Sequence, residues 1–355
     1  MGVVACFAVV GCAEHGERIA REVEEAVERA VEPGVGVDPD PAAPESDTVT
    51  WARFLEGVDE DVEPRRLEQR DGGGYQVFAV SEQTVYVVEA NAAGEMEAQR
   101  AINVPSTGEA MDITEDGGYV FAGSADGDMH VLKTHAEGNS EWGLPPGGEG
   151  YGSSASVQQT RDGGYIIGGD CDVYVVGQMS LWKVDAEGAL EWQRGYASSD
   201  GDPFSSGDIA YQTHDGGHML TGSTGGDYVS AWLYMVKTDM AGEREWDYHF
   251  RKDIGHHRSY DGLETSDGGY VLVGNISNTE MANRTEAVAP LIVKVDAEGN
   301  SEWEQAIERE KTADELVTVQ ETAGGGFVLA GKSAVGAEQE NSQAYLVKLS
   351  PDSAV

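Results

Sequence analysis

A short motif that recurs six times restricts the folds open to this chain more than any other feature. It consists of Asp-Gly-Gly followed by Tyr or His. Complete copies begin at Asp116, Asp162, Asp215 and Asp267. Degenerate copies occupy residues 71–75 and 324–327, and an apolar run follows each copy. Because Asp bonds its own turn backbone and Gly supplies a positive φ, every copy predicts a β-hairpin, with the Asp as turn former rather than ligand.

A second motif lies downstream of the first in each repeat. It is an apolar strand followed by Lys, D-x-x-G and E-W, as in residues 181–192, 235–246 and 292–303. Repeats of roughly 50 residues are typical of four-stranded propeller blades. We therefore predict an all-β fold for residues 48–355, a six-bladed β-propeller with four-stranded antiparallel blades. The last repeat lacks its E-W strand, so residues 48–55 should complete that blade and remove an open sheet edge.

Two residue types recur in a fixed register of the second motif. The tryptophans are Trp51, Trp142, Trp192, Trp246 and Trp303, with Met96 in the first unit. The lysines are Lys133, Lys183, Lys237, Lys294 and Lys348. We interpret the Trp residues as a packing layer between blades. The Lys residues should form ion pairs or cation–π contacts with the acid or Trp of the same repeat. A substrate-binding ring of five lysines is the alternative.

The charge balance excludes some partners. The chain has 64 acidic and 23 basic residues, a formal net charge of -41. Nucleic acids and anionic membrane surfaces need a basic face, so neither is an expected partner. In composition the chain resembles proteins of salt-loving archaea. At 1 M salt the Debye length is roughly 3 Å, which suppresses surface repulsion, whereas low salt should strain the fold.

The N-terminal 47 residues differ from the rest. Residues 1–12 form a short apolar signal segment that ends in a lipobox-like V-V-G-C, which predicts lipidation of Cys12. Residues 13–47 form an acidic stalk helix and a Pro-rich linker. This order predicts an exported, lipid-anchored protein at the cell surface. The alternative is an apolar N-terminal strand or frayed end on a cytoplasmic protein. The three cysteines form no disulfide framework, and Cys171 should be a small buried hydrophobe.

The second motif resembles the repeat of PQQ-like propellers. The first resembles repeats of secreted archaeal and bacterial propeller proteins, including halophilic lipoproteins of unknown function. Together the resemblance covers residues 48–350 and implies the fold rather than an activity. Quinoprotein dehydrogenases use an adjacent cysteine pair and metal ligands at the quinone. This chain has no adjacent cysteine pair, so no quinone cofactor is expected.

One loop is basic within the acidic chain. Residues 249–258 read HFRKDIGHHR. Its candidate ligand-binding residues are Arg251, Lys252, His256, His257 and Arg258. The hypothesis is an anion site for a carboxylate or phosphate. Two alternatives remain, a metal site at His256 and His257 and a local counter-charge for surrounding acids.

Other candidate sites are weaker sequence matches. Acids in Gly-rich loops could bind Ca²⁺ or simply be solvated. They are Asp126, Asp128, Asp200, Asp202 and Asp227. Asn275 and Asn283 begin N-glycosylation sequons.

No catalytic residue is predicted from the sequence, and no cofactor is expected apart from Ca²⁺ as an option. The leading hypothesis is a monomeric, surface-anchored propeller that binds a protein or glycan partner without catalysis, with membrane contact only through the lipid anchor. A propeller enzyme acting on a sugar or polysaccharide is one alternative. A cytoplasmic interaction module is another.

Overall fold

The computed structural model describes most of the chain from Glu63 to Ser350. The segments that lie outside the described residues are 1–62, 71–73, 82–83, 94, 105–109, 126–127, 145–151, 172–177, 200, 203, 228–229, 251–255, 278–287, 308–311, 323–324, 336–341 and 351–355. The predicted signal segment, Cys12, the stalk, the linker and Trp51 all fall in the first of these.

The described residues form antiparallel β-sheets and no helix, as predicted. Consecutive strands build six blades. Blade 1 contains β1 (Glu63–Gln69), β2 (Tyr75–Ser81), β3 (Thr84–Ala90) and β4 (Met96–Asn103); blade 2 contains β5 (Ala110–Ile113), β6 (Tyr119–Ala125), β7 (Asp128–Thr134) and β8 (Ser140–Leu144); blade 3 contains β9 (Gly152–Gln159), β10 (Tyr165–Cys171), β11 (Gln178–Val184) and β12 (Leu190–Tyr196).

The remaining three blades follow the same order. Blade 4 contains β13 (Phe204–Gln212), β14 (His218–Asp227), β15 (Ser230–Thr238) and β16 (Arg244–Phe250); blade 5 contains β17 (His256–Glu264), β18 (Tyr270–Ser277), β19 (Val288–Val295) and β20 (Ser301–Ala306); blade 6 contains β21 (Thr312–Glu321), β22 (Phe327–Val335) and β23 (Ser342–Leu349). The six-bladed β-propeller is confirmed, with three strands described in blade 6.

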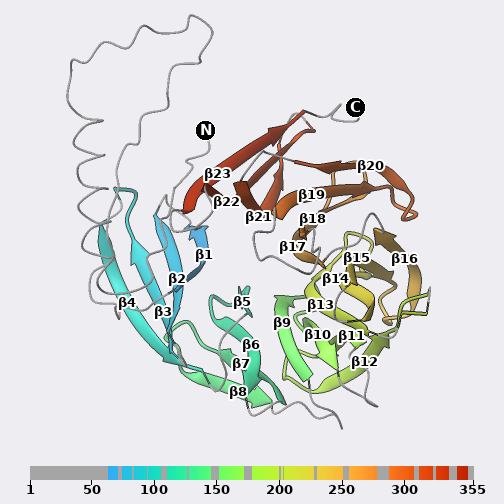
Figure 1. The fold of residues 1–355 in the computed structure, drawn as a ribbon. Coiled ribbons are helices and arrows are strands. Elements are labelled where there is room, and N and C mark those ends of the chain that lie inside the picture. The colour runs from blue at the N-terminus through green and yellow to red at the C-terminus, as the bar shows by residue number, and fades with distance from the viewer. Residues whose placement is uncertain are drawn as a thin grey trace, which may run out of the picture. The chain divides into compact units, whose positions relative to one another are not determined.

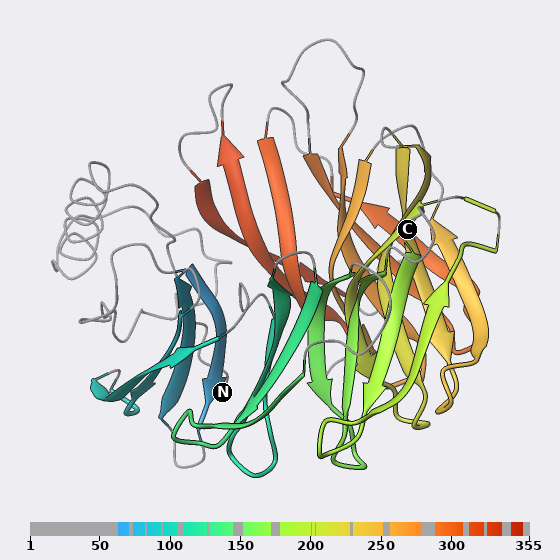
Figure 2. The same cartoon turned by 90° about the horizontal axis from the view of Figure 1, so that it is seen from below.

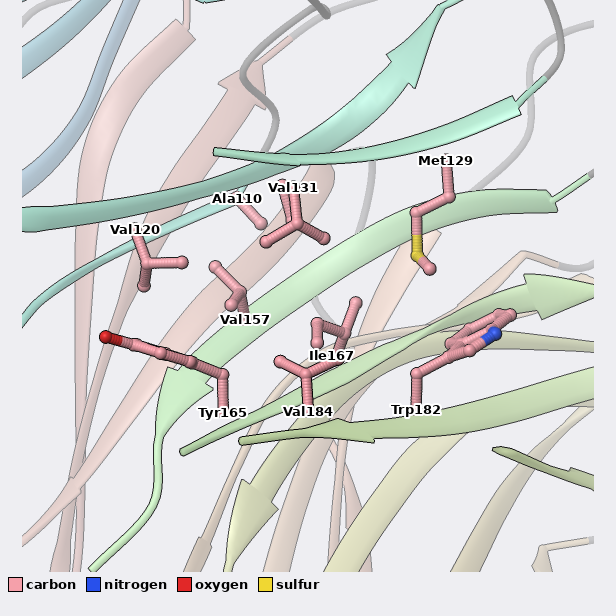
Figure 3. Close-up of a cluster of buried hydrophobic side chains, with 10 residues drawn as sticks. Ala110, Val120, Met129, Val131, Val157, Tyr165, Ile167, Trp182 and Val184 are labelled. Carbon is pink, nitrogen blue, oxygen red and sulfur yellow. The ribbon is translucent and has the colours of Figure 1, made fainter. Parts of the chain in front are cut away.

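The chain divides into two compact units, with blade 1 in one and blades 2–6 in the other. Within blades 2–5 the first strand of each blade is innermost and the fourth is outermost, and in blade 6 β21 is innermost of the three described strands (Figure 1). Figure 2 shows the same strands from the side. Apolar side chains fill the spaces between neighbouring blades. Between blades 2 and 3, Val120 and Val131 face Val157, Tyr165 and Ile167 (Figure 3).

The Asp-Gly-Gly hairpin forms as the motif predicts. In blade 2 the Gly118 N–H donates to Asp116 Oδ1 at 2.9 Å, and Gly117 has a φ of 80°. The same bond joins Gly164 to Asp162, Gly217 to Asp215 and Gly269 to Asp267. The Asp is therefore a turn former, and a positive φ at the first Gly explains why the motif needs glycine there.

Four of the five repeat lysines join this turn to the outer strand of their own blade through ion pairs. Lys237 is 2% exposed, and its Nζ lies 2.8 Å from both Asp215 Oδ2 and Glu245 Oε2. Equivalent pairs link Lys133 to Asp116 and Glu141, Lys183 to Asp162 and Glu191, and Lys294 to Asp267 and Glu302. The hydrogen bond and charge of each lysine help to hold the pKa of its turn Asp at about 2, against the opposing effect of burial.

Blades 1 and 6 depart from this lysine pattern. In blade 1 the lysine position is Glu89, which pairs with Arg70 at 3.1 Å and Arg100 at 2.6 Å, so the sign of the charges is exchanged. In blade 6 Lys348 is exposed, and the turn sequence Gly324-Gly325-Gly326 contains no carboxylate. The register also corrects one assignment. Glu89 pairs with Ala98 as Lys133 pairs with Trp142, so Ala98, and not Met96, occupies the Trp position.

Each repeat tryptophan packs on the next blade. Trp142 contacts Tyr165 edge-on at 5.5 Å, and its indole N–H donates to Ala186 O at 3.1 Å. Trp246 makes the same contacts with Tyr270 and Ala297 O. Trp192 packs on His218, and Trp303 on Phe327. The four repeat tryptophans with described side chains therefore each pack against a ring of the neighbouring blade, and Trp142 and Trp246 also bond to the turn between its third and fourth strands.

Side chains also accept hydrogen bonds from the backbone N–H groups at the inner edges of the blades. The innermost strand has no backbone partner on one side, so its outward N–H groups need acceptors. Side chains of the preceding blade provide them. Asp112 accepts from Gln159 N, Ser156 from Ala210 N, Gln158 from Gln212 N and Asp261 from Val319 N, at 2.8–2.9 Å. This bonding explains why polar residues occupy the inner strands.

His218 breaks the repeat at the interface of blades 3 and 4. It stands where other complete motifs have Tyr, is 1% exposed, and packs on Trp192 at 5.4 Å. Its Nδ1 lies 3.3 Å from Asp239 O, and its Nε2 has no hydrogen-bond partner. Burial, assisted by the charges of Lys183 and Lys237, lowers the pKa of His218 from 6.5 to about 4. Protonation of His218 therefore opposes folding.

The low pKa predicts a pH dependence that His218→Tyr should remove. Between pH 6.5 and pH 4 the unfolded chain binds a proton that the folded chain does not, so wild-type stability should fall by about 3 kcal/mol as the pH decreases through this range. Urea unfolding of both proteins at pH 7, 5.5 and 4.5 measures the difference. His214→Gln, at a histidine that is 76% exposed, is the control. Equal pH slopes in wild type and His218→Tyr would contradict the prediction.

Candidate functional site

The repeat separates structural positions from candidate functional ones. Residues that recur with the same contacts in successive blades hold the blades together. A polar group confined to one blade is not needed for that purpose and is a candidate for function. Blade 4 carries such a group on its two outer strands.

The blade 4 cluster consists of Tyr234, Arg244, Asp247, His249 and Ser198. Tyr234 lies on β15, the next three on β16, and Ser198 on the connection between β12 and β13. The strand register gives the equivalents in blades 3 and 5. Tyr234 corresponds to Ser180 and Leu291, Asp247 to Gln193 and Glu304, and His249 to Gly195 and Ala306.

Close contacts join these side chains. The rings of Tyr234 and His249 stack at 4.5 Å with an interplanar angle of 3°. Tyr234 donates its hydroxyl to Asp247 Oδ2 at 2.8 Å, and Ser198 Oγ lies 3.1 Å from His249 Nε2. Because β15 and β16 are adjacent antiparallel strands, Tyr234 and His249 are direct cross-strand neighbours.

Asp247 accepts hydrogen bonds from several donors of the cluster. Arg244 Nη1 and the backbone N–H of Ser199 both donate to its Oδ2 at 3.2 Å. Burial alone raises the pKa of Asp247, but the hydrogen bonds from Tyr234 and Ser199 and the charge of Arg244 lower it below its ordinary 3.8. Burial and the Asp247 hydrogen bond raise the pKa of Tyr234. The cluster therefore holds a carboxylate and a neutral phenol at neutral pH.

The Ser, His and Asp of this cluster are not arranged for nucleophilic catalysis. A triad needs the acid on one imidazole nitrogen and the serine on the other. Here Ser198 Oγ and Asp247 Oδ2 both approach His249 Nε2, at 3.1 and 4.0 Å. Arg244 also donates to Ala197 O at 2.9 Å. The arrangement attaches the connection at residues 197–199 to the outer strand of blade 4, beside the start of the predicted basic loop.

Sugar hydrolysis by a general acid would require a carboxylate with a raised pKa, and Asp261 on the inner strand β17 is such a carboxylate. Burial raises the pKa of Asp261 above its ordinary 3.8, as a general acid requires. However, Thr318 Oγ1 and Val319 N donate to its Oδ2, both at 2.8 Å, and Gly262 N donates to Oδ1 at 2.9 Å. Because its carboxylate accepts these hydrogen bonds, Asp261 joins blade 5 to blade 6 and has a structural role.

The structure divides the predicted basic loop. His249 and Phe250 end β16, and His256, His257 and Arg258 begin β17 rather than lying in a loop. In β17 they pair with Ser277, Ile276 and Asn275. Arg251 and Lys252 lie outside the described residues, as do the side chains of the other three. The anion site stays a prediction, and only the connection 251–255 separates the two strands.

The other candidate sites have mixed outcomes. Of the five loop acids proposed for Ca²⁺, Asp202 has a described side chain, and it accepts a hydrogen bond from Ser198 at 3.2 Å. Among the described residues no three His, Cys, Asp or Glu side chains come together as a metal site. Asn283 is outside the described residues. The predicted glycosylation at Asn275 is wrong, because Asn275 is 4% exposed within β18 and its side chain has no room for a glycan.

Two further sequence predictions concern cysteine and the membrane. Cys171 ends β10, opposite Gly152 and Gln178, but its side chain is not described. In the part of the chain that the structure describes, no helix has the length and apolar character to span a bilayer.

Reading the repeats in columns would have revealed the blade 4 cluster. Aligned on the Lys and Trp positions, the sequence shows Tyr234, Asp247 and His249 as departures from the neighbouring blades. The residues that recur in this register predict the blades, whereas these three do not recur. The basic sequence of residues 249–258 indicates His249 alone and contains no signal for its partner on the adjacent strand.

Comparison with known proteins supports the fold and gives no information on the function. No family model matches the chain, and no curated protein resembles it in sequence. Solved structures do resemble it. A protein from Lactobacillus plantarum is 12% identical with a TM-score of 0.51, and the match covers 81% of this chain and 84% of that one.

Two other solved structures have stated roles. Virginiamycin B lyase from Staphylococcus aureus is 9% identical, with a TM-score of 0.45 and coverage of 82% of this chain and 97% of that one. The calcium-binding protein regucalcin from Agrobacterium tumefaciens is 13% identical, with a TM-score of 0.42 and coverage of 78% and 84%. At such identities the likeness concerns the fold alone. The PQQ-like resemblance stays a prediction.

Proposed function

We propose that this protein is a non-catalytic binding scaffold. The observation that supports the proposal is a difference between the two ends of the blades, because one end repeats its contacts and the other end varies. Four buried lysines and four tryptophans repeat the same contacts at the Asp-Gly-Gly end of the sheets. The connections at the opposite end differ in length and sequence from blade to blade. A rigid frame that presents variable segments is suited to recognition.

The location of the scaffold is a proposal from the sequence. The lipobox-like segment that ends at Cys12, followed by a stalk and a Pro-rich linker, supports a lipid anchor at the cell surface. Intact-mass analysis of the native protein tests this directly. A mass that matches a chain beginning at a diacylglyceryl-modified Cys12 is expected, and an unmodified Cys12 would instead favour the cytoplasmic module.

The charge of the chain favours one class of partner. With 64 acidic and 23 basic residues, long-range attraction concentrates cationic ligands and repels anionic ones. A basic protein surface or a cationic small molecule therefore fits better than an anionic polysaccharide. The basic residues of 251–258 are the exception, and they support a carboxylate or phosphate contact at one local point.

Binding without turnover is the measurement that tests the scaffold. The full-length protein, incubated with sets of oligosaccharides, basic peptides and organic amines, should show a saturable rise in thermal midpoint with at least one set. Mass spectrometry of the ligand after prolonged incubation should show no change. Cleavage or oxidation of the ligand at ordinary enzymatic rates would replace the scaffold with the sugar-acting enzyme.

A further inference from the structure

The innermost strands of successive blades share a β-bulge at one register. In each, the strand pairing skips one residue that lies four positions before the end of the strand. The skipped residues are Ala155 in β9, Asp208 in β13, Tyr260 in β17 and Val317 in β21. Blade 1, considered by itself, has the same irregularity at Arg65 in β1. A bulge that recurs in this way is a built feature of the blade.

A bulge changes the direction of a side chain. An extra residue in one strand places two successive side chains on the same side and turns one of them away from the packed layer. In β21, Leu316 is completely buried between blades, whereas the bulge residue Val317 is 43% exposed. Ala155 is exposed in the same way. These four strands are the innermost strands of blades 3–6 in Figure 1, so the exposed residues Ala155 and Val317 belong to the inner edge of their blades.

The residues at the bulge do not repeat, although the backbone does. Small, acidic, aromatic and aliphatic side chains occupy the four positions. The positions that hold the blades together behave differently, since the turn Asp, the Lys and the Trp recur in successive blades. A constant backbone position with a variable side chain is the arrangement expected of a recognition surface.

The bulges of blades 4 and 5 are adjacent through a direct bond. Ser259 donates its hydroxyl to Asp208 Oδ2 at 2.6 Å, and Tyr260 is the next residue after Ser259. The bond joins the carboxylate of one inner strand to the segment of the next inner strand that carries Tyr260. Tyr260 is half-buried, so part of its surface remains open to a ligand.

A carboxylate beside an aromatic ring suits an organic ammonium ion. The carboxylate provides charge-assisted hydrogen bonds, and the ring face attracts the cation through its quadrupole. The net charge of -41 adds long-range attraction for cations, from which a neutral sugar gains nothing. Val317 and Ala155 occupy the same bulge position on the neighbouring blades, and their apolar side chains suit the carbon chain of an amine.

We propose that Asp208 and Tyr260 form the centre of a binding site for an organic ammonium ion on the inner strands, with Ala155 and Val317 at its sides. This proposal rests on the scaffold function and names the ligand class of that scaffold. The site lies within blades 3–6 and is distinct from the blade 4 cluster on the outer strands.

Isothermal titration with spermidine, using the full-length protein in 1 M KCl, tests the site. At this salt concentration the Debye length is roughly 3 Å, so attraction from distant charges is suppressed and direct contacts remain. Asp208→Asn, which keeps an oxygen for Ser259, should weaken binding about tenfold or more. Tyr260→Leu should weaken it about fivefold, and Tyr260→Phe should bind like the wild type.

Glu187→Gln is the matched control, because Glu187 is an exposed acid in the hairpin between β11 and β12. It should bind spermidine within about twofold of the wild type. Equal losses in Asp208→Asn and Glu187→Gln would overturn the proposal and indicate diffuse attraction. Absence of spermidine binding, with saturable binding of a neutral oligosaccharide, would overturn the ammonium site and leave the scaffold function standing. Thermal melts of each variant confirm that a loss of binding occurs in folded protein.

Discussion

Replacing Gly299 with alanine is expected to lower the free energy of unfolding by about 4 kcal/mol. Two costs add at this position. Gly299 has a φ of 82°, where any L residue is strained by about 1–2 kcal/mol. A Cβ there would also lie 2.6 Å from ring atoms of Trp246, so the indole must move and lose burial and its bond to Ala297 O. Urea unfolding measures the loss.

Gly268→Ala in the same blade separates these two costs. Gly268 has a φ of 85°, but nothing lies within 4 Å of the Cβ that alanine would add. It should therefore cost only the backbone strain, about 1–2 kcal/mol. A larger effect in Gly299→Ala than in Gly268→Ala supports the contact between the Trp of one blade and the turn of the next. Equal effects would show that this contact adds nothing to stability.

Transfer from molar salt to low salt is expected to unfold the protein. The net charge of -41 is spread over one chain, and the Debye length grows from roughly 3 Å at 1 M to roughly 30 Å at 0.01 M, so acidic side chains repel one another over much longer distances. A domain is stable by only about 5–15 kcal/mol, which this repulsion can exceed. The thermal midpoint should rise steeply between 0.05 and 2 M KCl.

Sucrose at matched osmolality is the control for the salt experiment. It stabilises folded proteins through exclusion from their surface but does not screen charge. It should therefore fail to replace KCl at low ionic strength. A thermal midpoint that is independent of KCl, or that sucrose restores fully, would contradict the view that charge repulsion limits stability. The lysine pairs should persist in salt because each lysine is buried.

The local motifs predicted the hairpins because their causes are local. Asp116 and Gly117 form their turn through contacts within four residues, and this information is present in any one repeat. The spacing of the repeats then gave the number of blades. The partners of Lys237 were less certain from the sequence, since an acid or a Trp in the same repeat satisfied the pattern. The structure places its Nζ against Asp215 and Glu245.

Predictions from the sequence were wrong where the position of a residue depended on strand pairing or on burial. The placement of Met96 in the Trp position followed from linear spacing, whereas the pairing of Glu89 with Ala98 assigns that position to Ala98. The sequon prediction at Asn275 took no account of burial, whereas Asn275 is 4% exposed within β18. The β-bulges at Asp208 and Tyr260 have no sequence signature in a single strand, because a bulge exists only relative to a partner strand.

The sequence by itself determined the strand class, the hairpin turns and the six-fold repetition of the blade. These follow from short-range preferences and from apolar patterning that is written again in each repeat. Only the tertiary structure decided which residues meet across blades, such as Trp246 with Tyr270 and Asp208 with Ser259. The reason is physical: these two contacts join residues 24 and 51 positions apart, and they form only after the strands between them have paired.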